Sequence, residues 1–259
     1  MDSALDFHSL RALLEWQVEL GADEAIGDVP VNRYEVQAKA PQVVALTGGP
    51  AAKVAPVAAT GGGAVAAARK AAEGAGDLEE LRAALAAYEH CDLKRGARNL
   101  VFSDGVPGAR VMIIGEAPGR EEDRAGRPFV GRAGQFLDRM LGAIGLSRAE
   151  NVYITNVMPW RPPQNADPKP DEIEMMRPFV ERHVALAKPD ILILMGNTSC
   201  QTVLGKQGIT RLRGQWDEAW GTPAMPMLHP AYLLRMPGAK RAAWADLLAV
   251  QARLHEGGA

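Results

Sequence analysis

Four short apolar runs, each followed by a segment of unusual composition, constrain the fold of this chain more than any other feature. Each run has the length of a strand: ARVMIIGE (109–116), NVYITNV (151–157), DILILMG (190–196) and AMPMLHP (224–230). Stretches with helical periodicity lie between and after them, at 133–145, 171–187, 197–204 and 239–254. Strands that alternate with helices predict the α/β class, with a three-layer α/β/α fold around a central four-stranded parallel sheet.

The first 77 residues differ in composition and predict separate units. Residues 4–20 place their leucines on one helical face, so residues 1–38 are interpreted as an N-terminal helical extension. Residues 39–77 are mostly Ala, Gly, Pro, Val and Lys, which bury too little apolar surface to offset the entropy of ordering. They predict a flexible linker, with an alanine-rich helix near 64–74 as the alternative. The main domain is then expected to span 78–259.

The overall composition narrows the functional classes. The 259 residues carry 29 Lys and Arg against 31 Asp and Glu, so a bound polyanion would need a local basic patch. Only two cysteines occur, Cys91 and Cys200, which argues against a disulfide framework. The N-terminus lacks a basic-then-apolar pattern, and no apolar run reaches about 20 residues. A cytoplasmic protein with no membrane association is expected.

The segments that follow the four runs are expected to meet at one edge of the sheet and to form a ligand site there. They are GEAPGREED (115–123), NVMPWRPPQNADP (156–168), GNTS (196–199) and HPAYLLR (229–235). A dinucleotide fingerprint would need Gly-x-Gly-x-x-Gly and a Walker loop would need Gly-Lys-Ser/Thr, and the first segment has neither pattern. Because the carboxylate of Glu116 stands where a phosphate would approach, nucleotide binding is disfavoured.

Glu116 and His229, at the ends of the first and fourth runs, indicate a different chemistry. A carboxylate can stabilise a developing cation or orient a water, and a histidine can donate to a leaving group. Together these are the groups needed to cleave a glycosidic bond to a base. Each residue also has an ordinary alternative, a solvated turn for Glu116 and a packed or capping histidine for His229.

Three segments resemble the signature sequences of family 4 uracil-DNA glycosylases. They are GEAPGREEDRAGRPFVGRAGQFLDRML (115–141), NVMPWRPPQNADPKPDEIE (156–174) and HPAYLLR (229–235), within a similarity that extends from about residue 88 to residue 250. The resemblance implies that Glu116 stabilises the sugar cation or positions the attacking water. It also implies that His229 binds O2 of the departing uracil anion.

The same resemblance implies a set of residues that bind the base. Phe129 would stack on the flipped base and the amide of Asn156 would read the base edge, with a core aromatic and a strand-end turn residue as their alternatives. Gly115, Ala117 and Glu122 would lie against the base. For Glu122, solvation at the surface is the favoured interpretation.

Contacts to DNA also follow from the resemblance. Residues 232–235 are similar to the intercalating loop of the family, so Leu233 or Leu234 would enter the base stack and Arg235 would meet a phosphate. An ordinary helix start that packs its leucines inward is the alternative. Arg213 would supply positive charge, and the helix that begins after Gly196, with Asn197 as its expected N-cap, could offer backbone amides to a phosphate.

Typical members of the family carry four cysteines that bind a [4Fe-4S] cluster. The matching positions in this sequence are Tyr88, Cys91, Trp160 and Met176, so one thiolate stands where about four ligands are needed. Trp160 and Met176 would fill the space of a cluster, and Cys91 beside His90 is not enough for zinc. We therefore expect a variant that lacks the iron–sulfur cysteines and uses no metal or other cofactor.

The sequence thus predicts a monomeric, monofunctional uracil-DNA glycosylase whose partner is uracil-containing DNA. It would flip uracil out of DNA and hydrolyse the N-glycosidic bond to leave an abasic site. The alternatives are a module that binds uracil or abasic DNA with little turnover, and a glycosylase for another deaminated base. Covalent capture of DNA is not expected, because residues 156–168 lack the Lys/Arg-rich insertion with a histidine that self-trapping relatives carry.

Overall fold

The computed structural model describes residues 61–256, which belong to the second of two units of the chain, Pro56–Ala259. The helix expected over 4–20 and the first part of the expected linker lie outside the described residues. The helices are α2 (Gly61–Glu73), α3 (Leu78–Ala87), α4 (Leu93–Gly96), α5 (Arg120–Ala125), α6 (Arg132–Gly142), α7 (Pro170–Ala187), α8 (Asn197–Leu204), α9 (Ile209–Leu212), α10 (Pro230–Arg235) and α11 (Lys240–Glu256), with 3₁₀ turns η1 (Pro163–Asn165) and η2 (Pro237–Ala239). None of these described helices has both the length and the apolar character that a membrane crossing requires.

The strands form one six-stranded sheet with the order β1-β3-β2-β4-β6-β5. They are β1 (Ser103–Gly105), β2 (Val111–Gly115), β3 (Val152–Asn156), β4 (Ile191–Met195), β5 (Asp217–Ala219) and β6 (Thr222–Met227). The four middle strands are parallel neighbours, so the expected parallel centre is confirmed. The antiparallel strands β1 and β5, which the sequence did not indicate, extend the two edges of this parallel centre. Each edge strand has only three residues, SDG and DEA, and no apolar run marks it.

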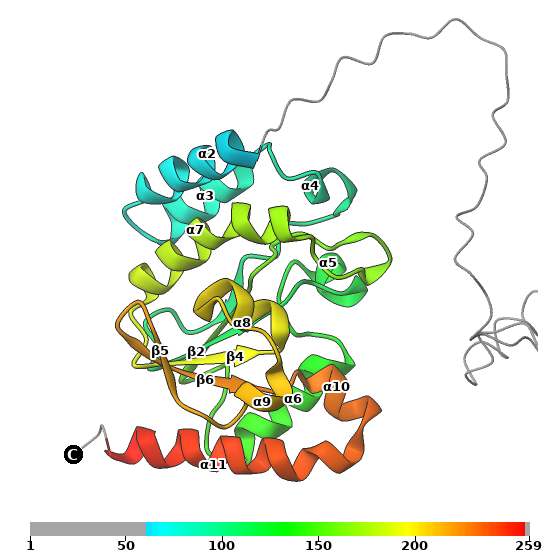
Figure 1. Cartoon of the computed structure of the whole chain (residues 1–259), viewed down its shortest axis with the longest axis vertical. Helices are drawn as coiled ribbons and strands as arrows, with labels where there is room; N and C mark the ends of the chain where they lie inside the picture. The colour runs from blue at the N-terminus through cyan, green and yellow to red at the C-terminus, as the bar shows by residue number, and fades with distance from the viewer. Residues whose placement is uncertain (1–60, 257–259) are drawn as a thin grey trace, which may run out of the picture. The chain divides into compact units, whose positions relative to one another are not determined.

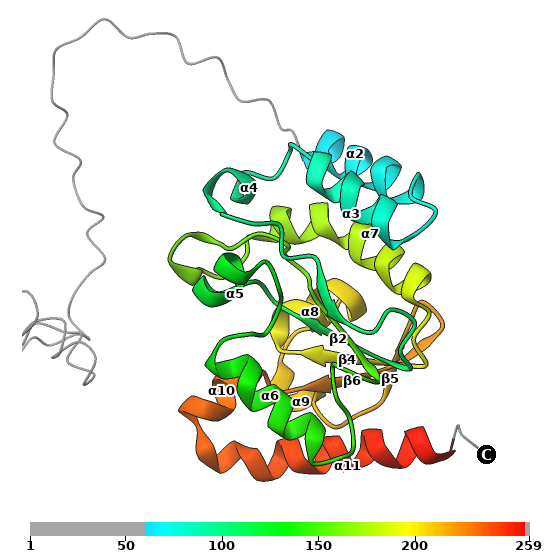
Figure 2. The ribbon, with the colours of Figure 1, turned by 180° about the vertical axis from the view of Figure 1, so that it is seen from behind.

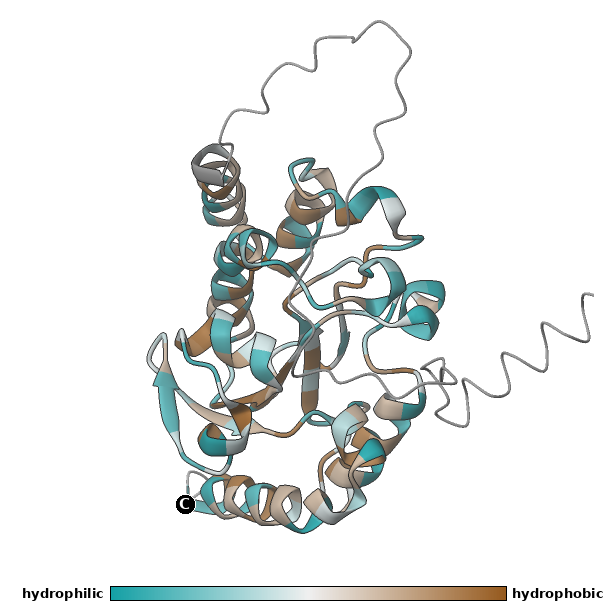
Figure 3. Cartoon of the chain, turned by 45° about the vertical axis from the view of Figure 1, so that its right-hand side comes forward, coloured by the Kyte–Doolittle hydropathy of each residue, from teal (hydrophilic) through white to brown (hydrophobic). Residues whose placement is uncertain are grey.

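Side chains of the parallel strands alternate between two buried faces, which explains why these strands are continuously apolar. On one face Met112 and Ile114 belong to a core shared with α2, α3, α7 and α8. On the other face Val111 and Ile113 belong to a core shared with α6, α10 and α11. Figures 1 and 2 show the two helical layers with the sheet between them, and the central strands are largely brown in Figure 3. The three-layer α/β/α prediction is confirmed.

Residues 61–77 do not form the predicted linker. Residues 61–73 form α2, and small side chains such as Ala64 pack it closely against α7. Arg182 of α7 donates to the Ala75 carbonyl oxygen from Nε at 2.9 Å and from Nη2 at 2.6 Å. Helix α7 supplies the apolar surface that this alanine-rich segment lacks by itself, so the segment is ordered where composition alone predicted a linker. The main domain therefore begins before residue 78, and the alanine-rich helix is the correct alternative.

Candidate active site

A cavity of about 280 Å³ lies at the carboxyl edge of the parallel strands, where the loops after β2, β3 and β6 meet. This volume is near the lower end of pockets that bind small molecules, about 300 Å³. The side chains around it include Glu116, Phe129, Asn156, His229 and Arg235. The loop after β4 lines a neighbouring cavity of about 400 Å³, which shares Glu116 and His229 with the first. The four segments expected to meet at one edge do so.

Asn156 ends β3 and contributes a buried amide to the cavity. Its side chain is 6 % exposed, and Oδ1 is the one buried side-chain polar atom in residues 61–256 that has no hydrogen-bond partner. An unpaired buried acceptor costs about 1–3 kcal/mol, so such an atom needs a partner from outside the protein, a water or a ligand. A ligand that brings an N–H donor to this wall would supply the missing partner.

Gly115, the register partner of Asn156, allows the cavity wall to close. A Cβ at this position would overlap Asn156 Oδ1 and would lie 2.5 Å from Cε2 of Phe129. The Phe129 ring is stacked with His229, with centroids 5.5 Å apart and planes inclined by 28°. Phe129 has a φ of 53°, a left-handed conformation that costs a residue with a Cβ about 1–3 kcal/mol. The aromatic wall thus depends on a glycine at 115 and on a strained backbone at 129.

Glu116 lines both cavities and is half-buried. Its Oε2 accepts a hydrogen bond of 2.9 Å from the hydroxyl of Thr198, in the first turn of α8. Burial raises the pKa of Glu116 above its usual value, while the Thr198 hydroxyl acts in the opposite direction. A carboxylate held in this way can face a developing positive charge. The sequence indicated Glu116 but not Thr198, because only the tertiary fold directs that hydroxyl to the loop after β2.

His229 follows β6 and is the N-cap of α10, as its capping alternative proposed. Its Nδ1 accepts a hydrogen bond of 3.2 Å from the Ala231 amide. In the neutral ring the proton therefore resides on Nε2, which makes this nitrogen a donor. Burial lowers the pKa of His229 to about 4, and the nearby Arg235 acts in the same direction. The cap thus fixes the tautomer of a neutral histidine that lines the cavity.

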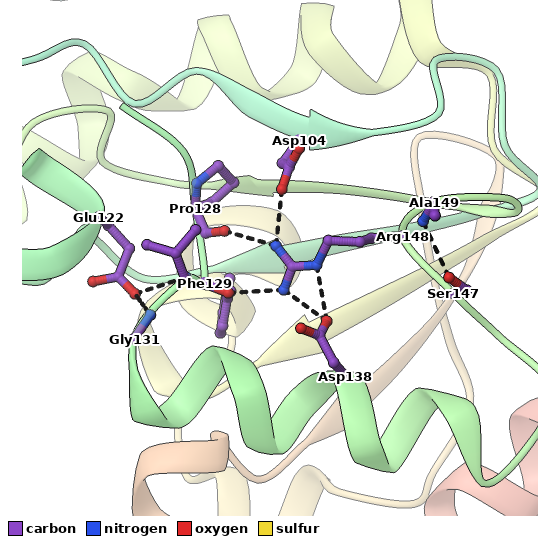
Figure 4. A network of polar contacts seen from close by, with 10 residues as sticks. Asp104, Glu122, Pro128, Phe129, Gly131, Asp138, Ser147, Arg148 and Ala149 are labelled. Atoms are coloured by element: carbon purple, nitrogen blue, oxygen red, sulfur yellow. Dashed lines mark hydrogen bonds and ion pairs between the residues drawn. The ribbon is translucent and has the colours of Figure 1, made fainter. Parts of the chain in front are cut away.

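Glu122 lines the cavity together with Ala117, but its carboxylate is bound by the main chain. Its Oε1 accepts hydrogen bonds from the amides of Val130 at 3.0 Å and Gly131 at 2.8 Å (Figure 4). Gly131 is the N-cap of α6, so Glu122 satisfies amides that precede the helix. The interpretation of Glu122 as a solvated surface residue is therefore wrong.

The two leucines of α10 differ in their surroundings. Leu233 is 1 % exposed and belongs to the core between α6 and α11, so the inward-packing alternative is correct for this residue. Leu234 is half-buried, and the exposed Arg235 reaches the wall of the 280 Å³ cavity. Leu234 therefore remains the candidate for the side chain that would enter the base stack of DNA.

Arg213 and Asn197 are engaged within the protein. Arg213 forms a two-pronged ion pair with the buried Asp246 of α11 and donates to the Ala242 carbonyl oxygen at 2.8 Å. Its charge is therefore neutralised internally, which does not support the expected DNA contact.

The N-cap of α8 is Gly196 rather than the expected Asn197. Asn197 Oδ1 instead accepts from the amides that start α9, at 3.1 and 2.8 Å.

The four positions that the resemblance matched to iron–sulfur cysteines lie in the core that α7 shares with α2 and α3, and Met176 belongs to α7 itself. Tyr88, Cys91, Trp160 and Met176 are each at most 5 % exposed and belong to one apolar cluster. Burial raises the pKa of the Cys91 thiol to about 11, so the group is a neutral thiol at pH 7. A [4Fe-4S] cluster needs about four thiolate ligands. These four positions provide one protonated thiol and three side chains that contain no thiol, so they do not fit such a cluster. Across residues 61–256, no group of three or more His, Cys, Asp and Glu is placed to hold a metal ion.

Comparison with known proteins agrees with this geometry. Residues 102–248 match the model of the Uracil DNA glycosylase superfamily. A type-4 uracil-DNA glycosylase of Sulfurisphaera tokodaii is 37 % identical over 175 residues, which cover 63 % of this chain and 79 % of the relative. The type-4 enzyme of Archaeoglobus fulgidus is 37 % identical, covering 62 % and 84 %, and that of Thermotoga maritima is 39 % identical, covering 56 % and 77 %.

The matched segment contains the whole 280 Å³ cavity and all four parallel strands. The chain therefore belongs to the uracil-DNA glycosylase superfamily. Within it, the relatives named above are type-4 enzymes, in agreement with the resemblance found in the sequence.

Proposed function

We propose that the protein excises uracil from DNA by hydrolysis of the N-glycosidic bond, in keeping with its relatives, which are named type-4 uracil-DNA glycosylases. The observation that carries this proposal is the unpaired Oδ1 of Asn156, buried in a cavity that also bears Phe129, Glu116 and His229. A pocket with an aromatic wall and one buried amide suits a flat base with alternating donors and acceptors.

The amide of Asn156 accounts for the choice of base. Its Oδ1 accepts from the N3–H of uracil, and its Nδ2 donates to O4 of the same edge. Cytosine presents an acceptor at N3 and a donor at C4, so with the amide in the orientation seen here both pairings fail and buried polar groups are left unpaired. Such a mismatch can produce discrimination of about 10⁴-fold.

Glu116 and His229 act on opposite charges as the bond breaks. The electron pair of the bond between C1′ and N1 leaves with uracil, and positive charge develops on the sugar. The carboxylate of Glu116 stabilises that charge and orients the water whose oxygen then bonds to C1′. The Nε2–H of His229 donates to uracil O2 and stabilises the anion, which takes up the proton that the water releases.

The DNA-binding surface is proposed at the mouth of the cavity. Leu234 enters the base stack in place of the flipped nucleotide, and Arg235 binds a phosphate beside it. The exposed start of α8 at Asn197 offers further backbone amides to the DNA backbone. We also propose that the enzyme acts as a monomer, because one chain supplies every side chain named for the pocket. Its proposed location is the cytoplasm.

Catalysis is proposed to proceed without an iron–sulfur cluster. The support is the apolar packing of Tyr88, Trp160 and Met176 and the neutral thiol of Cys91. The purified protein is expected to be colourless. An absorption band near ~400 nm with stoichiometric iron, as thiolate-ligated clusters give, would contradict this proposal.

Release of free base from oligonucleotides containing uracil, hypoxanthine, xanthine or cytosine tests the function. Uracil is expected to be released fastest, in repeated turnovers. Asn156→Asp, which lacks the donor to O4, is expected to lower the ratio of uracil to cytosine release by at least about 10-fold. Tight binding of uracil DNA without release would indicate a binding module, and preferred release of hypoxanthine or xanthine would indicate another deaminated base.

A further inference from the structure

Arg148, outside the cavity, is the centre of a polar network that ends at the aromatic wall (Figure 4). Its side chain is 17 % exposed, and its guanidinium makes four hydrogen bonds and one further ion-pair contact. Nε and Nη2 both contact Asp138 at 2.8 Å, and Nη1 contacts Asp104 at 2.9 Å. The other two contacts are to carbonyl oxygens, Pro128 at 3.1 Å and Phe129 at 2.8 Å. The network therefore joins β1, α6 and the segment that carries Phe129.

The backbone of Phe129 is held from both sides. Arg148 binds its carbonyl oxygen, while the Glu122 carboxylate binds the amides of the next two residues. Gly134 allows α6 to lie close to the backbone of Phe129, because a Cβ at position 134 would overlap the Phe129 carbonyl group. Since Phe129 has a φ of 53°, these contacts maintain a conformation that the residue would not keep by itself.

The position of the Phe129 ring depends on this backbone. The ring lies against Gly115 and is stacked with His229, so a change of φ toward an ordinary value would move it away from both. Arg148 does not line the cavity, and its hydrogen bonds to the carbonyl oxygens of 128 and 129 connect it to Phe129 through the main chain.

We propose that Arg148 is a positioning residue for base recognition, which locks Phe129 in the strained conformation that presents its ring to the flipped base. The inference rests on the proposed uracil excision for its functional consequence, but not for the locking itself. The guanidinium is required in this role because its planar array of donors reaches two carboxylates and two carbonyl groups at once, which a lysine ammonium cannot do.

A double-mutant cycle between Arg148 and Phe129 tests the proposal. The measured quantity is the ratio of two dissociation constants, for DNA with a non-cleavable 2′-fluoro-2′-deoxyuridine and for DNA with an abasic site. Arg148→Gln and Phe129→Leu are each expected to raise this ratio by about 10-fold, because base stacking is lost while backbone contacts remain. The double variant is expected to resemble Phe129→Leu alone, because Arg148 acts through Phe129.

Arg148→Lys and Arg110→Gln complete the design. Arg148→Lys keeps the charge between the two aspartates and is expected to give a smaller rise, which covers the case in which Arg148→Gln does not fold. Arg110 pairs with Asp190 at the amino ends of β2 and β4, away from the cavity at their carboxyl ends. Arg110→Gln is therefore a matched control that should leave the ratio unchanged. Additive effects in the cycle, or an unchanged ratio in both Arg148 variants, would overturn the proposal.

Hydrogen exchange separates this inference from the proposed function. In Arg148→Lys the amides of Val130 and Gly131 are expected to exchange at least about 10-fold faster than in the wild type, whether or not the protein releases uracil. Unchanged exchange would show that Arg148 does not hold the segment. A wild-type protein that releases no base, with exchange accelerated in the variant, would instead count against uracil excision alone.

Discussion

His229 and His183 are both buried, and burial lowers the pKa of each, to about 4 for His229 and about 3 for His183. His183 lies on α7 and is stacked on Phe102 at 4.5 Å, and its Nε2 is hydrogen-bonded to the Tyr153 hydroxyl at 2.9 Å. The space beside it is about 10 Å³, roughly the size of one water. His229 instead lines cavities of about 280 and 400 Å³.

The comparison separates the proposed catalytic histidine from one that is packed in the core. A lowered pKa is a consequence of burial, and the pKa of both histidines is lowered in this way. Only His229 combines a fixed tautomer with space for a ligand beside the ring. The interior around His183 is packed and its hydrogen bond is made. Substitutions in the two regions should therefore affect different properties.

The largest effect is expected from His229→Ala, which should lower the single-turnover rate of uracil release by about 10²–10³-fold. The reason is that the donor to O2 stabilises charge that appears only in the transition state. His183→Phe, which keeps a ring against Phe102, should leave the rate essentially unchanged. Rapid-quench measurements on a uracil oligonucleotide with excess enzyme would compare the two.

A better leaving group provides the control for this assignment. 5-Fluorouracil needs less stabilisation as an anion, so it should partly restore the rate of His229→Ala. Glu116→Gln should be restored less, because its deficit concerns the charge on the sugar. Equal restoration of the two variants would contradict the division of roles, and full activity of either one would contradict the site itself.

The second prediction concerns stability and its dependence on pH in the interior region. At pH 8, His183→Phe should lower the free energy of unfolding by about 1–3 kcal/mol, because the buried Tyr153 hydroxyl loses this partner. Below pH 6.5 the unfolded wild type binds a proton on His183, whereas the folded protein does so only near pH 3. The wild type therefore loses stability as the pH falls through this window, and the variant lacks that loss.

Urea unfolding at pH 8 and at pH 4.5 would measure this difference. The gap between wild type and His183→Phe should narrow or reverse at the lower pH. His229 is present in both proteins, so its own titration cancels in the comparison. A gap that stays constant over the pH range would show that His183 does not remain neutral in the folded protein.

The smallest effect is expected from Thr198→Val in the site region. Loss of the hydroxyl removes the hydrogen bond that favours the charged form of Glu116, so burial raises the pKa of Glu116 further. The active carboxylate is present above this pKa and is lost as the pH falls through it. The acidic limb of the rate profile should therefore move to higher pH, with a loss of roughly 3- to 10-fold on that limb.

Thr202→Val is the matched control for this prediction. Thr202 lies one turn further along α8, and its hydroxyl donates to the Thr198 carbonyl oxygen at 2.8 Å without touching Glu116. It should leave the acidic limb in place. An equal displacement in both variants would indicate that α8 has shifted, rather than that one hydrogen bond was lost.

Much of the fold could be predicted from the sequence, because the parallel strands and their helices are encoded by local apolar patterns. The strands 111–115, 152–156 and 191–195 fall within the predicted runs, and α7 and α8 match their predicted ranges within one residue. Glu116, Asn156 and His229 could be placed at one edge because parallel strands end together there. Their meeting in a single cavity follows from that rule.

What the sequence could not provide depends on contacts between distant segments. Helix α2 is stabilised by α7, more than a hundred residues away, and the edge strands are too short and polar to form a pattern. Leu233 and Leu234 are neighbours in the chain, but only the packing of α10 on α6 and α11 decides which one is buried. The targets of Arg148, Arg213 and Thr198 are likewise set by tertiary structure.

The two short edge strands also affect how the protein behaves at high concentration. A long, flat, uncharged edge is a template on which strands of other molecules assemble into aggregates. Here the apolar parallel strands are paired on both sides, and each outer strand is three residues long and carries a charged side chain. Asp217 on β5 is paired with Lys206, and Asp104 on β1 is paired with Arg148. Edge-to-edge growth of the sheet would have to disrupt these ion pairs for very few new backbone hydrogen bonds.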